Sequence, residues 1–532
     1  MKAILTTAIS ALLCLANPAL SQSQVYAAWT QIEGSRASVQ PADEFMDLWV
    51  SLRIVLPSTN PNAACPDFKV AVDYTTGSTV YDSPFLPRNA TTATDGFGVQ
   101  VCQFGAINNQ LIEARLLQAD GQTPVTLSGT NRPVVFKGAS TVSLNETSPG
   151  FIVLGDSGCR GGDKQNCDNS QPSDKTGFFL ETVASMAQQR NPQFVIHVGD
   201  YRYDDNIYCT GNPLPSTCGD PAQEPIKWQK WQSDFFSRVR SGLLMDVPWA
   251  FSRGNHEWCD GAGPGYNYFF GDITQRKTCD GYDKTVFAPW YFDVTDRSTP
   301  NAQPHRFVMM DAQPAAESYM QALSWADTNW SHIANAKPSA WLVHHLPLWA
   351  IEEGTERNNG KNVKIIKANN SAEETALADA VSQLPASSTC AQPYDNASCG
   401  FKSVLSGHTH MLQNFGFVDN ALPQQYAIGL SGVRLDHSFA EESCRFPLPT
   451  LGMVGPSNSN MTGALMQSKG RDHHTTGDDN FGYGYFVRDA SQATNGGWSG
   501  MITFVDGRTE PLDSAANLTQ TDVNNLPVCE PS

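Results

Sequence analysis

The stretch that decides the fold is FVIHVGDYRYDD, Phe194 to Asp205. It is an apolar run that stops at a glycine, a carboxylate and two tyrosines. Short runs of this kind, rich in aromatic and β-branched residues and bounded by Gly or Pro, are typical of buried strands. Five further runs stop in the same way at Asp, Asn or His: FIVLGDSG (Phe151 to Gly158), VPWAFSRGNHE (Val247 to Glu257), RFVMMDA (Arg306 to Ala312), AWLVHHLP (Ala340 to Pro347) and KSVLSGHTH (Lys402 to His410).

Polar residues at the ends of successive strands are typical of the ligand crevice of an open α/β sheet. Carboxylate, amide oxygen and imidazole suit iron, manganese or zinc. No cysteine stands among these strand-end residues, which argues against a thiolate zinc site. Two metal ions that share one carboxylate would use six such side chains. The alternative, a hydrogen-bonded polar residue at each strand end, explains a single position better than it explains the ordered set. The six residues are Asp156, Asp200, Asn255, His345, His408 and His410.

The chain has 532 residues, which is too long for one ordinary core and predicts at least two domains. Residues 1–21 are expected to be a signal peptide, because Lys2 precedes an apolar segment and a cleavage pattern ends at Ser21. No other run is long enough to span a bilayer, so we expect a secreted or periplasmic protein. Residues 22–148 contain alternating runs such as DLWVSLRIVL and FKVAVDY, which predict an all-β sandwich domain of fibronectin or immunoglobulin type.

Residues 149–532 change to a strand, helix, strand rhythm and are expected to form one α/β domain. Helices are predicted over 174–190, 226–244, 317–334 and 372–384, with the tryptophans of the second helix in the core. The runs QQYAIGLSG, YGYFVRD and GMITFVDG are expected to complete a second sheet. The long polar stretch from Arg434 to Asn480 is typical of a functional or disordered loop.

Twelve cysteines remain once Cys14 is removed with the signal peptide. An even number in an exported chain favours disulfides, although the connectivity is open. Pairing neighbours in sequence gives Cys65–Cys102, Cys159–Cys167, Cys209–Cys218, Cys259–Cys279, Cys390–Cys399 and Cys444–Cys529.

The formal net charge is −18, and it becomes −19 without Lys2. Proteins that bind polyanions normally present a basic face, so we expect no nucleic acid and no anionic membrane as partner. A small anion held by a metal remains compatible with this charge.

The ordered blocks resemble the five motif blocks of the calcineurin-like metallophosphoesterases. They are Gly155-Asp156-Ser157-Gly158, Gly199-Asp200 to Tyr203, Gly254-Asn255-His256-Glu257, Leu342 to His345, and Gly407-His408-Thr409-His410. Tyr203, three residues after Asp200, is the particular mark of purple acid phosphatases within that superfamily. The resemblance implies an αββα fold, in which helices flank a two-sheet β-sandwich, preceded here by the all-β domain.

The resemblance also implies a binuclear centre. Fe(III) would be bound by Asp156, Asp200, Tyr203 and His410, and Asp200 would bridge to a divalent ion (Fe, Zn or Mn) bound by Asn255, His345 and His408. His256 would contact the phosphate or protonate the leaving group. Tyr203 could instead be a buried aromatic beside a site without ferric iron, and His256 a structural histidine of its loop.

The expected activity is hydrolysis of small phosphate monoesters by metal-bound hydroxide at acid pH, an acid phosphatase activity. One alternative is a phosphodiesterase or nucleotide hydrolase that uses the same site. Another is a secreted binding protein with a vestigial site.

The sequence departs from the family after Trp349, where the tartrate-resistant type has a further histidine and this chain has Glu352, Glu353 and Gly354. One of His437, His473 and His474 would replace that histidine. The alternative is that each of them is a solvated loop histidine. His197 and His344 lie within predicted strands, where they would support the ligands or fill the core.

Overall fold

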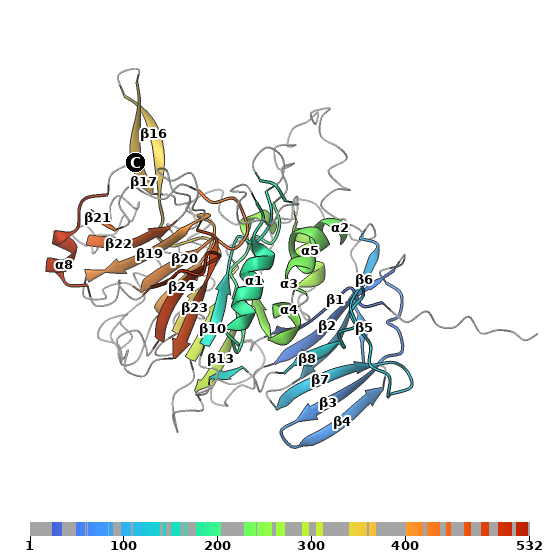
Figure 1. Ribbon diagram of the computed structural model, residues 1–532. Helices are drawn as coiled ribbons and strands as arrows, with labels where there is room; N and C mark the ends of the chain where they lie inside the picture. The colour runs from blue at the N-terminus through green and yellow to red at the C-terminus, as the bar shows by residue number, and fades with distance from the viewer. Residues whose placement is uncertain are drawn as a thin grey trace, which may run out of the picture.

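The computed structural model describes a little over half of the chain. The described residues are 24–33, 49–58, 60, 62–82, 84–88, 97–107, 110–138, 142–144, 150–160, 165–167, 177–203, 228–240, 242–257, 262–271, 290–296, 305–311, 340–358, 361–368, 401–418, 423–436, 443–447, 462–469, 480–488, 498–512 and 518–529. The elements form two large sheets, two small ones and a set of helices (Figure 1).

The first large sheet has ten strands in the order β25-β24-β23-β10-β11-β12-β1-β2-β6-β5. At its centre β10, β11 and β12 are parallel, and β12 is also parallel to β1. The remaining pairs are antiparallel. The strands are β1 (Ala27–Ile32), β2 (Val50–Pro57), β5 (Leu86–Pro87), β6 (Val99–Ile107), β10 (Gly150–Leu154), β11 (Val195–His197), β12 (Trp249–Phe251), β23 (Gly482–Arg488), β24 (Trp498–Phe504) and β25 (Thr509–Pro511).

The second large sheet has nine strands in the order β21-β22-β19-β20-β18-β15-β14-β13-β9. Strands β14, β15, β18 and β20 run parallel to one another. The strands are β9 (Ser143–Leu144), β13 (Trp290–Asp296), β14 (His305–Met309), β15 (Ala340–Val343), β18 (Phe401–Ser406), β19 (Leu412–Phe417), β20 (Gln424–Ile428), β21 (Cys444–Pro447) and β22 (Thr462–Lys469). All six apolar runs therefore form strands, three in each sheet.

Aromatic side chains pack the two sheets face to face. Phe151 of β10 stacks on Phe194 and meets Phe307 and Trp341 of the second sheet edge to face, at ring separations of 5.0, 5.1 and 5.7 Å. Because side chains alternate along a strand, the neighbours of Phe151 point to the opposite face. Ile152 and Leu154 accordingly belong to the other core cluster, which contains the helices.

The helices lie along that other face of the ten-stranded sheet (Figure 1). They are α1 (Leu180–Gln189), α2 (Trp228–Trp231), the π-helix η4 (Gln232–Phe236), α3 (Ser237–Val239), α4 (Leu243–Asp246) and α5 (Gly263–Phe269), with a 3-10 turn η5 at Asn255–Glu257. The helical layer that the αββα arrangement predicts is therefore present on the ten-stranded sheet. The helices predicted over 317–334 and 372–384 lie outside the described residues.

Two predicted helices differ in extent from those observed. Helix α1 begins at Leu180, because Gly177 is held in a bridge to Asn166 and is not helical. The helix predicted over 226–244 is interrupted at Gly242, and its π-helical turn buries both Phe235 and Phe236.

The N-terminal region is all-β where it is described, as predicted, but its strands belong to two sheets. Strands β3 (Lys69–Tyr74), β4 (Gly77–Asp82), β7 (Leu111–Leu117) and β8 (Val135–Lys137) form a separate four-stranded sheet. Strands β1, β2, β5 and β6 instead extend the ten-stranded sheet through the parallel pair β1–β12, with Gln31 opposite Trp249. The sheet thus runs across the expected domain boundary at residues 148 and 149.

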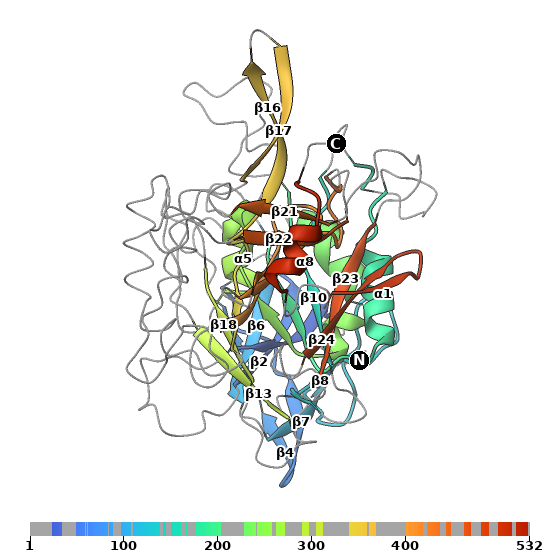
Figure 2. The same ribbon diagram turned by 90° about the vertical axis from the view of Figure 1, so that its left-hand side faces the viewer.

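Two smaller elements lie at the periphery. Among the described strands, β16 (Ile351–Asn358) and β17 (Lys361–Ala368) pair only with each other, and they project as a hairpin from the body, in yellow in Figure 2. Helix α8 (Gln520–Asn525) begins with a capping box formed by Thr519 and Asp522.

Three of the predicted disulfides are present, namely Cys65–Cys102, Cys159–Cys167 and Cys444–Cys529. The pairs predicted for Cys209, Cys218, Cys259, Cys279, Cys390 and Cys399, and the signal peptide, lie outside the described residues. Within the described part of the chain, no helix is long and apolar enough to cross a membrane.

Candidate metal centre

Four side chains of the candidate site sit on strained backbone. Asp156, Asp200, His408 and His410 have φ values of 54°, 59°, 74° and 44°, in the left-handed region that residues with a Cβ rarely adopt. Each such residue costs on the order of 1–3 kcal/mol and persists only where its surroundings impose it. The turns after β10, β11 and β18 are therefore built to aim these side chains.

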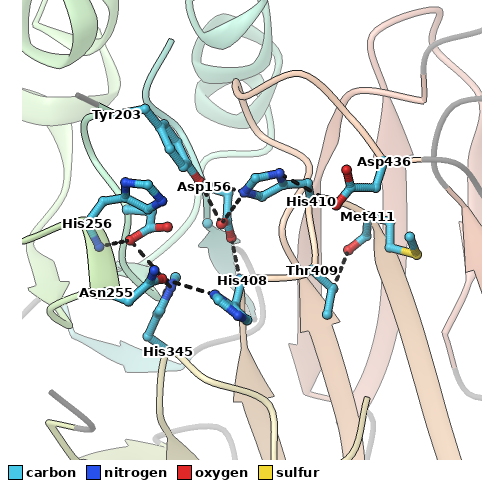
Figure 3. A network of polar contacts seen from close by, with 12 residues as sticks. Asp156, Tyr203, Asn255, His256, His345, His408, Thr409, His410, Met411 and Asp436 are labelled. Atoms are coloured by element: carbon cyan, nitrogen blue, oxygen red, sulfur yellow. Dashed lines mark hydrogen bonds and ion pairs between the residues drawn. The ribbon is translucent and has the colours of Figure 1, made fainter. Parts of the chain in front are cut away.

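The candidate residues come from both sheets and meet where the strands end. Asp156 follows β10, Asp200 follows β11, Asn255 follows β12, His345 follows β15 and His408 follows β18. Figure 3 shows the side chains of the candidate ligands gathered at this junction: Asp156, Tyr203, Asn255, His345, His408 and His410. Parallel strands place their carboxyl ends at the same edge, which explains why residues far apart in sequence gather there.

The first cluster is formed by Asp156, Tyr203 and His410. The Tyr203 hydroxyl donates a hydrogen bond to Asp156 Oδ1 at 2.8 Å and lies 3.1 Å from His410 Nε2. His410 Nε2 lies 3.7 Å from Asp156 Oδ1. The phenol, the carboxylate and the imidazole thus converge, all three buried.

The second cluster is formed by Asn255, His345 and His408. Asn255 Oδ1 lies 2.8 Å from His345 Nε2 and 3.0 Å from His408 Nδ1 (Figure 3). The other ring nitrogen of His345, Nδ1, donates to the Val198 carbonyl at 2.8 Å. That bond orients the ring so that Nε2 faces the cluster and would be the nitrogen that binds a metal ion.

Asp200 belongs to both clusters. Its carboxylate lies within ligand distance of His345 and His408 on one side and of Asp156 and His410 on the other, with each set of ligand atoms inside 4.8 Å. Asp200 Oδ2 is buried and has no hydrogen-bond partner among the described residues. A buried carboxylate oxygen without a donor is costly, and a bound cation would satisfy it. These residues therefore fit two metal ions that share Asp200.

Glycines allow the ligand loops to approach one another. A Cβ at Gly254 would overlap Asp200 Oδ1, and a Cβ at Gly407 would overlap Asp156 Oδ2. Gly199 has a φ of 114°, and a Cβ there would lie 2.6 Å from His345 Nδ1. Each of these three glycines leaves room for a ligand side chain from another strand.

Glu257 joins two of the ligand loops from behind. Its buried carboxylate accepts the backbone N–H of Asp200 and of Gly254 on Oε2, at 3.0 and 2.9 Å, and that of Tyr201 on Oε1 at 3.0 Å. One side chain therefore fixes the turn after β11 against the turn after β12.

His197 supports a third loop. Its Nδ1 accepts the N–H of Gly199 at 3.2 Å, so Nε2 carries the proton and donates to Ser157 Oγ at 2.7 Å. The ring also stacks on Tyr201 at 4.0 Å. His344 donates from Nδ1 to the Leu346 carbonyl at 2.6 Å. The supporting role expected of these histidines agrees with these contacts.

Burial and charge together shift the pKa values of the ligand set. Burial and the neighbouring Asp200 raise the pKa of Asp156 to about 7, against the charge of His345. Burial lowers the pKa of His408 and of His410 to about 3, so both rings are neutral lone-pair donors. Burial opposes a charge on His345, but the Asp200 carboxylate outweighs it and raises the pKa of His345 to about 9.

Asp200 itself stays ionised. Burial disfavours its charge, but His345, His256 and the His256 backbone N–H together hold the pKa of Asp200 below its usual range. Burial and the Asp156 carboxylate raise the pKa of Tyr203 well above its usual range. Anionic Asp200 beside the neutral imidazoles of His408 and His410 is a donor set suited to a cation.

Sequence reasoning did not identify the roles of Glu257 and Ser157. Glu257 and Ser157 stand inside the quoted motif blocks, so their position was a signal, but only the fold shows which backbone groups they bind. The outer position after Trp349 falls in β16, while His437, His473 and His474 lie outside the described residues. Among the described residues of the stretch that begins at Arg434, Asp436 lies beside the first cluster, with its Oδ2 3.6 Å from His410 Nδ1 (Figure 3).

Comparison with known proteins assigns this region to a family. Residues 151–412 match the model of the calcineurin-like phosphoesterase family. No curated protein matches the chain. Among solved structures, the purple acid phosphatase PPD1 from yellow lupin (Lupinus luteus) seeds is similar, with 13% identity, a TM-score of 0.48, and coverage of 96% of this chain and 77% of that one. The family match spans all five motif blocks and the strands that carry them, and the chain therefore contains a calcineurin-like metallophosphoesterase domain.

Proposed function

We propose that this protein is a binuclear-metal phosphomonoesterase of the purple acid phosphatase type, active at acid pH. The observation that carries the proposal is the convergence of two donor clusters on one buried carboxylate, Asp200. Asp156, Tyr203 and His410 would hold one ion, and Asn255, His345 and His408 the other. Two bound ions would supply charge neutralisation of the phosphate oxygens and activation of water.

We infer that His256 acts on the leaving group. Its backbone N–H donates to Asp200 Oδ1 at 3.0 Å, which ties its position to the shared carboxylate. Its half-buried ring lies 4.3 Å from the Tyr203 ring at the edge of the first cluster (Figure 3). A histidine there can donate a proton to the departing alkoxide, a general-acid contribution of about 10²- to 10⁴-fold.

The experiment compares His256→Ala with the wild type on two monoesters that differ in their leaving group. We expect kcat to fall strongly for an alkyl phosphate and less for p-nitrophenyl phosphate, whose leaving group needs little protonation. Metal content and the unfolding temperature should not change. An equal rate for wild type and variant on the alkyl phosphate would contradict the role. Faster turnover of a diester than of either monoester would contradict the monoesterase assignment.

Tyr203 tests the ferric subclass. We propose that its phenolate binds Fe(III) and gives the protein a visible absorption band, with Fe, Zn or Mn as the second metal. Tyr203→Phe should remove the band. Full metal content without any visible band in the wild type would keep the phosphoesterase and exclude the purple subclass.

The proposal includes export. The apolar N-terminal segment, the three disulfides and the net charge of −18 support a secreted or periplasmic enzyme that acts on small phosphate esters. Sequencing the N-terminus of the protein recovered from the periplasm or medium tests the expected cleavage after Ser21. Recovery of the full chain in the cytoplasm would contradict it.

A further inference from the structure

The segment that follows β20, residues 429–436, is held against two ligand turns of the first cluster. The Val433 N–H donates to the Asp156 carbonyl at 2.8 Å. The Asp436 N–H donates to the His410 carbonyl at 3.1 Å. Most of the segment is buried, and only its last residue, Asp436, is exposed. Its backbone therefore has a defined place beside Asp156 and His410.

Asp436 brings a carboxylate to the outer side of the His410 ring. Its Oδ2 lies 3.6 Å from His410 Nδ1 (Figure 3). The other ring nitrogen, Nε2, faces Tyr203 and Asp156 at 3.1 and 3.7 Å. A separation of 3.6 Å is slightly longer than a direct hydrogen bond. The Asp436 side chain is 59% exposed and the χ2 torsion of Asp is broadly distributed, so the carboxylate can rotate to close this gap.

The carboxylate matters because the two nitrogens of a neutral imidazole differ. One carries the proton, and the other offers the lone pair that a metal ion needs. Metal-binding histidines usually donate their N–H to a carboxylate or a backbone carbonyl, which fixes the tautomer and the orientation of the ring. The Val198 carbonyl occupies this position for His345, at 2.8 Å from Nδ1. Asp436 offers a carboxylate in the corresponding position to His410.

We propose that Asp436 is a positioning residue for His410. Its carboxylate accepts the proton of Nδ1, so that Nε2 faces the first cluster as the lone-pair donor. The inference rests on the proposed metal-dependent function, because it gives His410 the task of a metal ligand. Asp436 acts through the histidine and not on the substrate. Loss of an outer partner of this kind typically lowers metal affinity by about 10- to 100-fold.

The first test determines the His410 tautomer in the metal-free protein. Long-range ¹H–¹⁵N NMR of histidine-labelled protein distinguishes a protonated Nδ1 from a protonated Nε2, and the His410 signals are those missing from His410→Gln. We expect the proton on Nδ1 in the wild type and a shift toward Nε2 in Asp436→Ala. Asp82→Ala is the matched control, because Asp82 at the end of β4 is also exposed and pairs with Lys69. This control removes the same charge and should keep the wild-type tautomer.

The second test is the binding of Zn²⁺ to the metal-free protein, in competition with a chromophoric chelator. The wild type should bind two ions. In Asp436→Ala we expect the affinity of one site to fall about 10- to 100-fold, while the other stays within about twofold. Asp82→Ala should keep both affinities, and the unfolding temperature of the metal-free protein should be the same in all three.

The two tests separate the role of Asp436 from the proposed function. With two Zn²⁺ ions bound to the wild type, an unchanged tautomer in Asp436→Ala, or affinities that stay the same or fall equally at both sites, would overturn the inference. Asp436 would then be a solvated surface carboxylate, and the phosphoesterase function would stand. If the wild type bound no Zn²⁺, the metal-dependent function would fail, and the tautomer would still decide whether Asp436 positions His410.

Discussion

Asp200 shows how much of this site depends on a single residue. It is fully buried, its backbone is held at a φ of 59°, and its Oδ1 accepts the His256 N–H. The carboxylate is ionised next to His345 and is shared by two clusters. The backbone strain of Asp200 and the desolvation of its carboxylate both cost free energy, and the cations that it would bind explain why the protein keeps it there.

Gly254 provides a test at the scale of one atom. Gly254→Ala places a Cβ where Asp200 Oδ1 lies, so we expect the carboxylate to shift. Overpacking costs about 1–3 kcal/mol of unfolding free energy, and a displacement near 1 Å can lower the rate on the order of 100-fold. Kinetics on an aryl phosphate and thermal unfolding measure both effects.

Gly105→Ala is the matched control, because a Cβ there meets nothing within 4 Å. It should leave activity and stability nearly unchanged. Wild-type activity in Gly254→Ala would contradict the close approach of these two loops.

Among the structural elements, the turns after β11 and β12 work as a pair held together by Glu257. We expect Glu257→Gln to loosen them, because an amide has one acceptor oxygen for three backbone donors and its NH₂ group would face an N–H. Burial and Asp200 raise the pKa of Glu257 to about 8, whereas His345 and the backbone N–H groups of Gly254 and Tyr201 oppose the shift. The expected loss is about 1–3 kcal/mol of stability with weaker metal retention.

The measurement is thermal unfolding together with metal content after dialysis against a chelator. An exchange between glutamine and glutamate elsewhere, such as Gln467→Glu, is not a suitable control, because Gln467 of β22 donates a hydrogen bond to Glu510. Thr79→Val in the exposed strand β4 is a better control for handling losses. If Glu257→Gln retained both its metals and its unfolding temperature, the two turns would be held by other contacts.

The strands and ligand turns could be predicted from sequence because their signals are local. Each apolar run is a buried strand bounded by Gly or Pro, and each polar residue that ends it marks a turn. The π-helical turn at Gln232–Phe236 could not be predicted, because it depends on fitting Phe235 and Phe236 into one aromatic core. Two of the donors to Glu257, the N–H groups of Asp200 and Tyr201, were hidden because they come from a turn far away in sequence.

At the scale of the whole molecule, the N-terminal strands are part of the catalytic fold. Gln31 Nε2 donates to the Phe270 carbonyl at 2.7 Å, and the fully buried Arg53 donates to the Phe269 and Gly271 carbonyls at 2.5 and 2.9 Å. Trp29 packs on Phe270 at 5.8 Å. This long-range pairing through β1 and β12 could not be read from the alternating pattern, which gives strands but not their partners.

We therefore expect a chain that begins at residue 149 to fail to fold stably, while one that begins at residue 22 folds. Removing β1 and β2 would expose the edge of β12 and leave the carbonyls around Phe270 without donors. Circular dichroism and gel filtration of the two chains provide the test. A monomeric, cooperatively unfolding 149–532 fragment would show instead that the boundary separates two independent domains.

The most direct test of the binuclear site is the metal content per chain of the purified protein, compared with that of Asp200→Asn. Asparagine keeps the size of the side chain and an acceptor for the His256 N–H, but removes the charge that both clusters share. We predict two metal ions per chain in the wild type and fewer than one in Asp200→Asn, with both proteins folded. Two ions per chain in both proteins, or none in the wild type, would contradict a centre built on Asp200.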